Sequence, residues 1–214
     1  LPGHGLSPGR RASLTRFDSY RTSLRVALDS LVADSTLPPP YLAIGHSTGA
    51  AVLLDTLLLD GAPMVDEVVL LAPLIRWANW RLSRIGQGLA GAFVDRVPRA
   101  FRNTTHDPKF RNFRSAIDPL QPTHIPLAWA RVMARHAEVV VGRTPVSRPV
   151  TVIQGSGDRT VDWRYNRAAL KRLLPGASWQ LIAGARHHLQ HETKRFRAPL
   201  FEALSAIMAR VRRN

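Results

Sequence analysis

One segment restricts the fold of this chain more than any other. Residues 41–44 (Tyr-Leu-Ala-Ile) form a short apolar run, residues 45–50 (Gly-His-Ser-Thr-Gly-Ala) a turn of mostly small residues, and residues 49–59 a stretch that would be apolar on nearly every side of a helix. A helix of this kind has no face for solvent, so we expect it to be packed between other elements, next to a buried strand. The segment predicts a strand followed directly by a helix in a layered α/β domain.

The rest of the chain repeats this alternation. Apolar runs at residues 67–72, 150–154 and 178–183 predict three further buried strands. Helical spacing of apolar residues predicts helices at residues 13–32 and 164–174 and at the C-terminus. Strands separated by helices pair in parallel, so we predict an α/β fold with a mostly parallel sheet flanked by helices. The buried face of the C-terminal helix should consist of Leu200, Leu204, Ile207, Met208 and Val211.

A long interval separates the second predicted strand from the third. Residues 76–148 contain helical pieces and turns but no strand pattern, and they are too many for a connecting loop. We therefore predict residues 1–75 as the first part of a core, residues 76–148 as an inserted helical lid, here called the cap, and residues 149–214 as the second part of the core. The cap has thirteen basic residues and four acidic ones, which are Asp95, Asp107, Asp118 and Glu138.

The turn after the first predicted strand matches Gly-x-Ser-x-Gly, with Ser47 at its centre. In such a tight turn the serine hydroxyl projects from the end of the strand, and Gly45, Gly49 and Ala50 are small because neighbouring backbone passes close by. The following helix points its positive end at the turn, so the backbone N–H of Thr48 is placed to donate to an oxyanion. An ordinary strand-to-helix turn is the alternative, and the flanking apolar strand and helix argue against it.

A serine hydroxyl is a poor nucleophile until a base removes its proton, so this interpretation requires a histidine and an acid elsewhere. The loop after the third strand holds Asp158 and Asp162, and the loop after the fourth holds His187 and His188. Asp158 is the preferred acid because it follows its strand through Gly-Ser-Gly, whereas Asp162 precedes a helical pattern as an N-cap does. His187 is the preferred base because residues 184–186 set the loop spacing and His188 begins the next apolar step.

Four segments in order resemble the α/β-hydrolase fold and, within it, the group of monoacylglycerol lipases, lysophospholipases and serine aminopeptidase-like enzymes. They are residues 1–9 (Leu-Pro-Gly-His-Gly-Leu-Ser-Pro-Gly), 45–49 (Gly-His-Ser-Thr-Gly), 155–158 (Gly-Ser-Gly-Asp) with Val161-Asp162, and 184–187 (Gly-Ala-Arg-His). Together they are specific for the fold and for a triad, but not for the substrate. The resemblance implies a serine hydrolase without a cofactor, in which Ser47 attacks, His187 transfers the proton and Asp158 orients the histidine.

The chain departs from the family pattern at its beginning. In the family, several strands and a His-Gly loop that supplies the second oxyanion donor precede the loop matched by residues 1–9. The resemblance therefore implies that the sequence is the C-terminal part of a longer hydrolase, with four strands of an eight-stranded sheet and with the second donor upstream of Leu1. In that case residues 41–44 should form a sheet edge.

Composition and motifs argue against several other classes. Cys is absent, so a disulfide scaffold is impossible, and proline and glycine interrupt the longest uncharged stretch, residues 35–54, so it is not a membrane span. The net charge of +15 suggests nucleic acid, but the basic residues are scattered and no zinc-finger or RNA-binding signature occurs, so we predict no nucleic-acid partner. His187 and His191 have a zinc-helix spacing, but Gly184 favours a loop, so we predict no metal. No phosphate-binding glycine motif follows a strand, so we predict no cofactor.

The predicted reaction is hydrolysis of a carboxylic ester, with a monoacylglycerol or a lysophospholipid-like lipid ester as the expected substrate. An aminopeptidase must pair the substrate ammonium with a carboxylate, and the cap has few acids among many bases. A serine aminopeptidase or amidase and a non-catalytic hydrolase-like binding module remain as alternatives. We expect a cytoplasmic protein, in which the basic cap either contacts anionic membranes peripherally or is a solvated arginine-rich surface.

Overall fold

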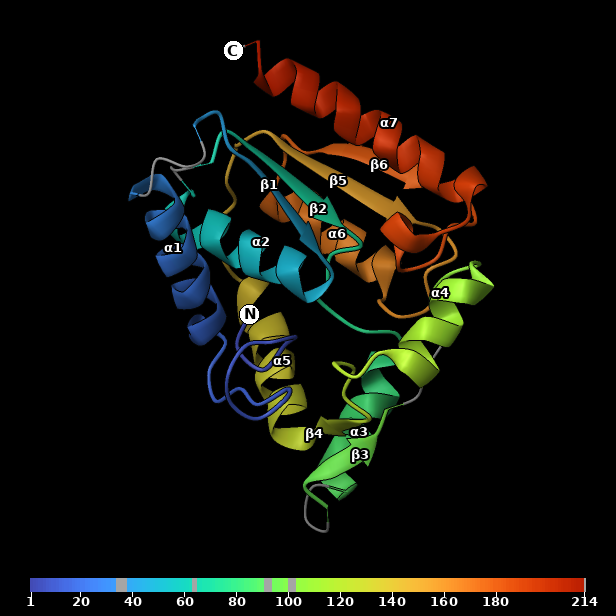
Figure 1. The fold of residues 1–214 in the computed structure, drawn as a ribbon. Coiled ribbons are helices and arrows are strands. Elements are labelled where there is room, and N and C mark those ends of the chain that lie inside the picture. The colour runs from blue at the N-terminus through green and yellow to red at the C-terminus, as the bar shows by residue number, and fades with distance from the viewer. Residues whose placement is uncertain (34–37, 63–64, 91–93, 100–102, 214) are drawn as a thin grey trace.

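A four-stranded parallel sheet forms the centre of the protein in a computed structural model that describes residues 1–33, 38–62, 65–90, 94–99 and 103–213 (Figure 1). The strand order is β1 (Leu42–His46), β2 (Glu67–Leu71), β5 (Val150–Gly155) and β6 (Ser178–Ile182), and every neighbouring pair is parallel. The predicted fold class is therefore confirmed. Strand β1 lies at one edge of this sheet, where Ile44 is 46% exposed.

Helices cover both faces of the sheet (Figure 1). On one face lie α2 (Thr48–Asp60) and α6 (Trp163–Leu173), and α1 (Asp18–Ala33) packs against α2. On the opposite face lies α7 (Lys194–Val211), which follows a short 3₁₀ helix at Leu189–His191. The α7 residues predicted to be buried are buried except Met208, which is 42% exposed because the helix meets the sheet along a narrower stripe than the sequence pattern suggested.

Alternating side chains of the strands supply the core on both faces. Val68 and Leu70 of β2 pack with residues of α2 and α6, whereas Val69 and Leu71 pack with residues of α7. Residues 50–58 of α2 are all buried, which explains the unusually apolar sequence of this helix. Each fully buried leucine, such as Leu54, stabilises the fold by about 1.5–3 kcal/mol relative to an exposed one.

The described residues between β2 and β5 form four helical pieces and a small second sheet. Helix α3 (Trp80–Ala90) is followed by β3 (Arg96–Pro98), α4 (Pro108–Asn112), a π-helical turn at Phe113–Ile117, β4 (His124–Pro126) and α5 (Leu127–Val140). Strands β3 and β4 pair antiparallel. These strands were not predicted, because three residues that include a proline are too few to show alternation.

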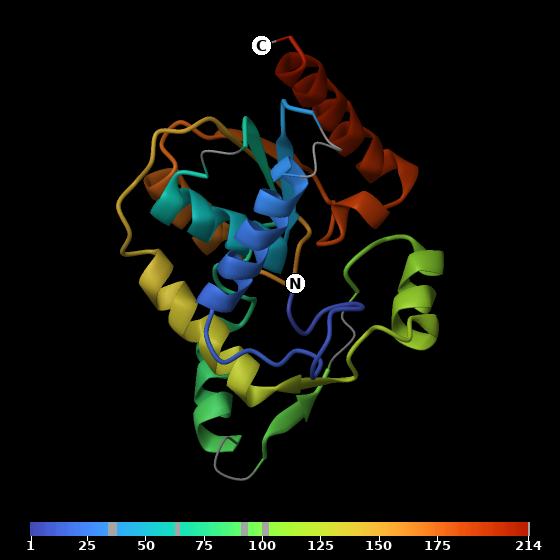
Figure 2. The same ribbon diagram turned by 60° about the vertical axis from the view of Figure 1, so that its left-hand side comes forward.

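The cap extends away from the sheet on the side opposite α7, as two views show (Figures 1 and 2). Helix α5 is different from the rest of the cap, because its residues Ala137 and Val140 pack in the core cluster with α2 and α6. Within the described residues, no helix combines the length and the apolar character that a bilayer span requires.

Candidate active site

Ser47 lies in a strained turn between β1 and α2. Its φ of 54° and ψ of −111° lie outside the regions that residues with a side chain prefer, at a cost on the order of 1–3 kcal/mol. The backbone holds this conformation, because the N–H of Ser47 donates to Leu71 O at 2.9 Å and its carbonyl accepts from Ala51 at 3.0 Å. A Cβ at position 45 would lie 2.7 Å from the carbonyl oxygen of Gly49, so the turn requires Gly45. The serine thus follows the carboxyl end of a strand, as predicted.

Three side chains from three loops form one chain of hydrogen bonds. The Nε2 atom of His187 lies 3.0 Å from Ser47 Oγ, and its Nδ1 atom lies 2.8 Å from Asp158 Oδ2. With the carboxylate ionised, Nδ1–H donates to Asp158 and leaves Nε2 to accept the serine hydroxyl proton. His187 and Asp158 are buried, while Ser47 is half-buried. The structure therefore brings together the serine, acid and base that were selected from the sequence.

Hydrogen bonds keep Asp158 ionised in spite of its burial. Its Oδ1 accepts the N–H groups of Thr160 and Val161 at 2.7 and 3.2 Å, and its Oδ2 accepts the side-chain amide of Gln154 at 3.1 Å. Burial raises the pKa of Asp158, but its bond to His187 and these donors outweigh burial, so the pKa lies below the usual value. The carboxylate can therefore stabilise a protonated imidazole at neutral pH.

The two alternative residues have other contacts. Asp162 is the N-cap of α6, where its Oδ1 accepts a backbone N–H of the first helical turn. The Nε2 atom of His188 lies 3.1 Å from Nη1 of Arg114, which donates to it from the cap. Burial and the neighbouring His187 lower the pKa of His188 to about 2, so it stays neutral. Neither residue occupies the hydrogen-bonded chain that begins at Ser47.

His46, the residue before Ser47, was not assigned a role from the sequence. Its Nε2 atom lies 2.9 Å from the backbone oxygen of His187, and the two rings lie 4.8 Å apart. Burial and the adjacent His187 lower the pKa of His46 to about 3, so a neutral imidazole donates Nε2–H to that carbonyl. His46 therefore fixes the backbone of the base loop to the serine turn. Its position inside the Gly-His-Ser motif was the available signal.

Glu192 connects the base loop to the cap and was also missed. Its carboxylate is fully buried and accepts the backbone N–H groups of Arg186 and His106, each at 2.8 Å. It also lies 3.0 Å from Nδ1 of His106. These donors outweigh burial and hold the pKa of Glu192 below its usual value. Among the described residues, no group of three His, Cys, Asp or Glu could hold a metal ion.

Asn166 of α6 fixes the start of the cap. Its side chain is 1% exposed, its Oδ1 accepts the N–H of Arg76 at 2.9 Å, and its Nδ2 donates to the carbonyls of Pro73 and Arg76 at 3.1 Å. Next to it, the N–H of Asp162 donates to the carbonyl of Arg76 at 2.9 Å. The first residues of the cap are thus tied to the loop that carries the acid. The sequence offered no signal for these contacts.

A parallel sheet with a serine turn after one strand, and an acid and a base after two later strands, is the arrangement of an α/β hydrolase. The model of the family described as "Serine aminopeptidase, S33" matches residues 1–194. The chain therefore belongs to this family of serine hydrolases, and the resemblance found in the sequence is confirmed. No curated protein sequence matches the chain.

Solved structures share the fold at low sequence identity. The monoacylglycerol lipase of Paleococcus ferrophilus has a TM-score of 0.78 at 16% identity, over 95% of this chain and 79% of that one. A soluble variant of monoglyceride lipase from Saccharomyces cerevisiae, in complex with a substrate analogue, has a TM-score of 0.75 at 18% identity, over 94% and 72%. Est1E from Butyrivibrio proteoclasticus, with ferulic acid bound, has a TM-score of 0.63 at 18% identity, over 99% and 75%. At these identities the likeness is one of fold.

Proposed function

We propose that the protein hydrolyses carboxylic esters, with Ser47 as the nucleophile, His187 as the general base and acid, and Asp158 as the residue that orients the imidazole. The observation that carries the proposal is the continuous chain of hydrogen bonds from Ser47 Oγ through both ring nitrogens of His187 to the Asp158 carboxylate. The acid has the protonation state that its role requires, because hydrogen bonds hold the pKa of Asp158 below its usual value and its carboxylate accepts from Nδ1 of His187.

The reaction proceeds in two acyl-transfer steps. Ser47 Oγ attacks the ester carbonyl while His187 Nε2 takes the hydroxyl proton, and the proton then passes to the leaving alcohol. In the second step a water molecule attacks the acyl-enzyme, with His187 again acting as base. This step releases the carboxylic acid product and restores the Ser47 hydroxyl. The N–H of Thr48, in the first turn of α2, has no intrahelical acceptor and donates to the oxyanion. One such donor typically contributes about 10²- to 10³-fold in rate.

The proposed substrate is a lipid ester with a single acyl chain, such as a monoacylglycerol or a lysophospholipid. Two of the structural neighbours are monoacylglycerol lipases. The family description instead names an aminopeptidase, which needs a carboxylate for the substrate ammonium. Near the base loop, Asp158 and Glu192 are both occupied by hydrogen-bond donors. This arrangement favours an ester over an N-terminal amine as the group that is recognised.

The cap is proposed to cover the opening above Ser47 and to meet the lipid. Its α4 segment lies against the base loop, where the ring of Phe110 stacks on His191 at 3.9 Å. On its outer surface Leu82 and Ile85 of α3 are 73% and 62% exposed, and Ile117 is 60% exposed. Apolar side chains on a basic surface suit peripheral contact with an anionic membrane. A solvated arginine-rich surface is the competing explanation.

Labelling and a substrate panel test the proposal. A fluorophosphonate should label Ser47 in the wild type and fail to label Ser47→Ala. Rates should then be compared for p-nitrophenyl esters, monoacylglycerols, lysophosphatidylcholine and amino-acid p-nitroanilides, with Ser47→Ala as the blank. We expect turnover of the esters and none of the anilides. Faster turnover of an anilide than of the esters would favour the aminopeptidase, and an unreactive Ser47 would favour a binding module.

A further inference from the structure

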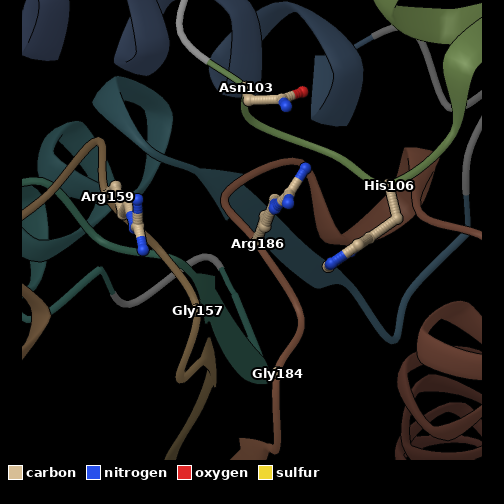
Figure 3. Close-up of a pocket in the computed structure, with 6 residues that line it drawn as sticks. All are labelled: Asn103, His106, Gly157, Arg159, Gly184 and Arg186. Atoms are coloured by element: carbon tan, nitrogen blue, oxygen red, sulfur yellow. The ribbon is translucent and has the colours of Figure 1, made fainter.

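A cavity of about 280 Å³ lies beside the acid and base loops, and the proposed hydrolysis makes no use of it. Three segments line it: the cap segment at residues 103–106, the acid loop and the base loop. Figure 3 shows the side chains arranged around the opening. The lining residues are Asn103, His106, Gly157, Arg159, Gly184 and Arg186.

Two polar side chains of the wall, Arg186 and Asn103, are held by neighbours outside the cavity. Nη1 of Arg186 donates to the carbonyl of Thr105 at 3.0 Å, which holds this guanidinium at the wall. The Oδ1 atom of Asn103 accepts from Arg111 at 2.8 Å, so the amide NH₂ is the end left for a ligand, and Figure 3 shows this nitrogen on the side of Arg186. Arg186 and Asn103 therefore offer hydrogen-bond donors that are already oriented.

The charge of the wall selects the ligand. Arg159 and Arg186 each bring a positive charge, and the lining residues that the structure describes include no carboxylate. Four acids belong to these segments or follow them, and all four accept hydrogen bonds from the protein. Glu192 accepts from Arg186 N–H and His106, and Asp158 accepts from His187 and backbone N–H groups. Asp107 and Asp162 are the N-caps of α4 and α6. Guanidinium groups bind oxyanions through paired, charge-assisted hydrogen bonds. Donors from three segments suit a tetrahedral anion with three or four oxygens better than a carboxylate with two.

We propose that this cavity binds a phosphate group, either as free phosphate or as part of a phosphate ester. Glycine suits the two loops here, because a Cβ at Gly157 would lie 2.5 Å from the carbonyl oxygen of Gly184. A bound phosphate would bridge the cap segment to the loops that carry Asp158 and His187. It would therefore stabilise the cap in the position seen in the structure.

Calorimetric titration and thermal unfolding of the purified protein test the proposal. Inorganic phosphate and glycerophosphocholine are titrated separately, at constant ionic strength set with sodium chloride. Asn103→Asp keeps the acceptor for Arg111 and nearly the same shape, but places a negative charge in the wall, so it should abolish binding. Arg159→Gln removes one exposed charge and should weaken binding about tenfold. Arg135→Gln, on the exposed side of α5, is the matched control and should bind like the wild type.

Saturable binding of either ligand, with a rise in Tm that Asn103→Asp loses and Arg135→Gln keeps, supports the proposal. Binding of phosphate alone would assign the site to the free anion, and binding of both would extend it to a diester head group. Absence of saturable binding of both ligands overturns it, as does an equal loss in Arg135→Gln. Because Ser47→Ala should bind phosphate like the wild type, a failure here leaves the proposed ester hydrolysis untouched, and the reverse also holds.

Discussion

The carboxyl end of the sheet, with the loops that carry the serine, acid and base, differs from the neighbouring cap in the contacts that stabilise it. At this end of the sheet, backbone groups make the main hydrogen bonds. The N–H of Ser47 donates to Leu71 of β2, and Asp158 accepts two N–H groups of its own loop. Every residue of strands β2 and β5, which lead to these loops, is buried. The geometry of the candidate triad therefore depends on the cooperative folding of the whole sheet.

Outside α5, which packs in the core, the cap is attached to this end of the sheet by a few backbone bonds, such as Asp162 N–H to Arg76 O, and by individual polar side chains. Asn166 holds its first residues, Glu192 holds residues 105–106, and Arg114 reaches His188 from the π-helical turn. Several apolar side chains of the cap face solvent, including Leu82 and Ile85. Under the proposed function, the two regions can be perturbed separately. Substitutions at the carboxyl end of the sheet should reduce the rate of hydrolysis, and substitutions of the polar attachments should loosen the cap.

The largest effect should come from removing the nucleophile or the base. Ser47→Ala and His187→Ala should each lower kcat for short p-nitrophenyl esters by at least about 10⁴-fold, because the two groups act as one unit. For the same reason the double variant should be scarcely slower than either single variant. His188→Ala is the control and should retain most of the activity. If His188→Ala loses activity while His187→Ala keeps it, the base has been assigned wrongly.

The next effect separates the two aspartates of one loop. Asp158→Asn removes the acceptor that holds the His187 tautomer, so kcat should fall by about 10⁴-fold with little change in secondary structure. Asp162→Asn keeps an N-cap oxygen for α6, so it should change kcat less than about threefold and unfolding by less than about 1 kcal/mol. Ester kinetics and urea unfolding of both variants provide the measurement. Comparable losses of kcat would contradict the separate roles.

A smaller effect is expected at the attachment of the cap. In the wild type both oxygens of the buried Glu192 carboxylate accept hydrogen bonds. Glu192→Gln replaces one of these oxygens by an NH₂ group, which faces donors and cannot accept from them. The free energy of unfolding should fall by about 2–4 kcal/mol, and amides of residues 104–106 should exchange faster. Glu202→Gln, exposed on α7, is the matched control. Unchanged stability of Glu192→Gln would mean that the cap is held by apolar packing rather than by this carboxylate.

Periodic patterns allowed the core to be predicted because each of its elements buries a continuous face. Strands β1, β2, β5 and β6 and helices α2 and α6 lie within a few residues of the predicted ranges. Ser47, Asp158 and His187 could be selected because each lies in the loop that follows a strand, and the carboxyl ends of parallel strands lie at the same end of a sheet. The order of the residues and the short loops were sufficient to select these candidates, because the backbone of a parallel sheet places the loops after its strands side by side.

The cap and the supporting residues lacked such local signals. The pairing of β3 with β4 joins residues 96–98 to residues 124–126, and no alternation marks either strand. Glu192 and Asn166 bond to backbone groups of His106 and Arg76, which are remote in the sequence. Their function depends on burial and on partners that the three-dimensional fold supplies, so residue type and spacing alone could not identify them.

Stability should depend on pH through α5, the helix by which the cap packs against the core. His136 of α5 is buried, and burial together with nearby Arg143 lowers its pKa to about 3. Between pH 6.5 and 3 the unfolded chain therefore binds a proton that the folded chain does not, so this residue lowers stability as the pH falls. From pH 7 to pH 5 the free energy of unfolding should therefore fall less in His136→Gln than in the wild type, by on the order of 1–2 kcal/mol.

Urea unfolding of the wild type and of His136→Gln at several pH values measures this difference. Asp55, whose pKa burial raises to about 6, has the opposite dependence, because its folded form binds a proton first as the pH falls. It is present in both proteins, but its Oδ1 atom lies 3.7 Å from Nδ1 of His136, so the same pair of proteins is also compared in an Asp55→Asn background. His124→Gln, exposed on β4, is the control and should follow the wild type. Parallel pH profiles for wild type and His136→Gln would show that the buried imidazole is not the source.

The smallest effect concerns the outer surface of the cap. Leu82→Gln with Ile85→Gln should leave hydrolysis of a water-soluble p-nitrophenyl ester unchanged within about twofold, because both side chains face solvent and lie outside the hydrogen-bonded chain. If the cap meets lipid, the same variant should co-sediment severalfold less with vesicles that contain anionic lipid. Basic residues contribute on the order of 1 kcal/mol each near such a surface and much less where salt shortens the Debye length to about 8 Å, so binding should also weaken at high salt. Val139→Gln, exposed on α5, is the matched control. Equal binding to neutral and anionic vesicles, or binding that salt does not change, would assign the arginines to a solvated surface.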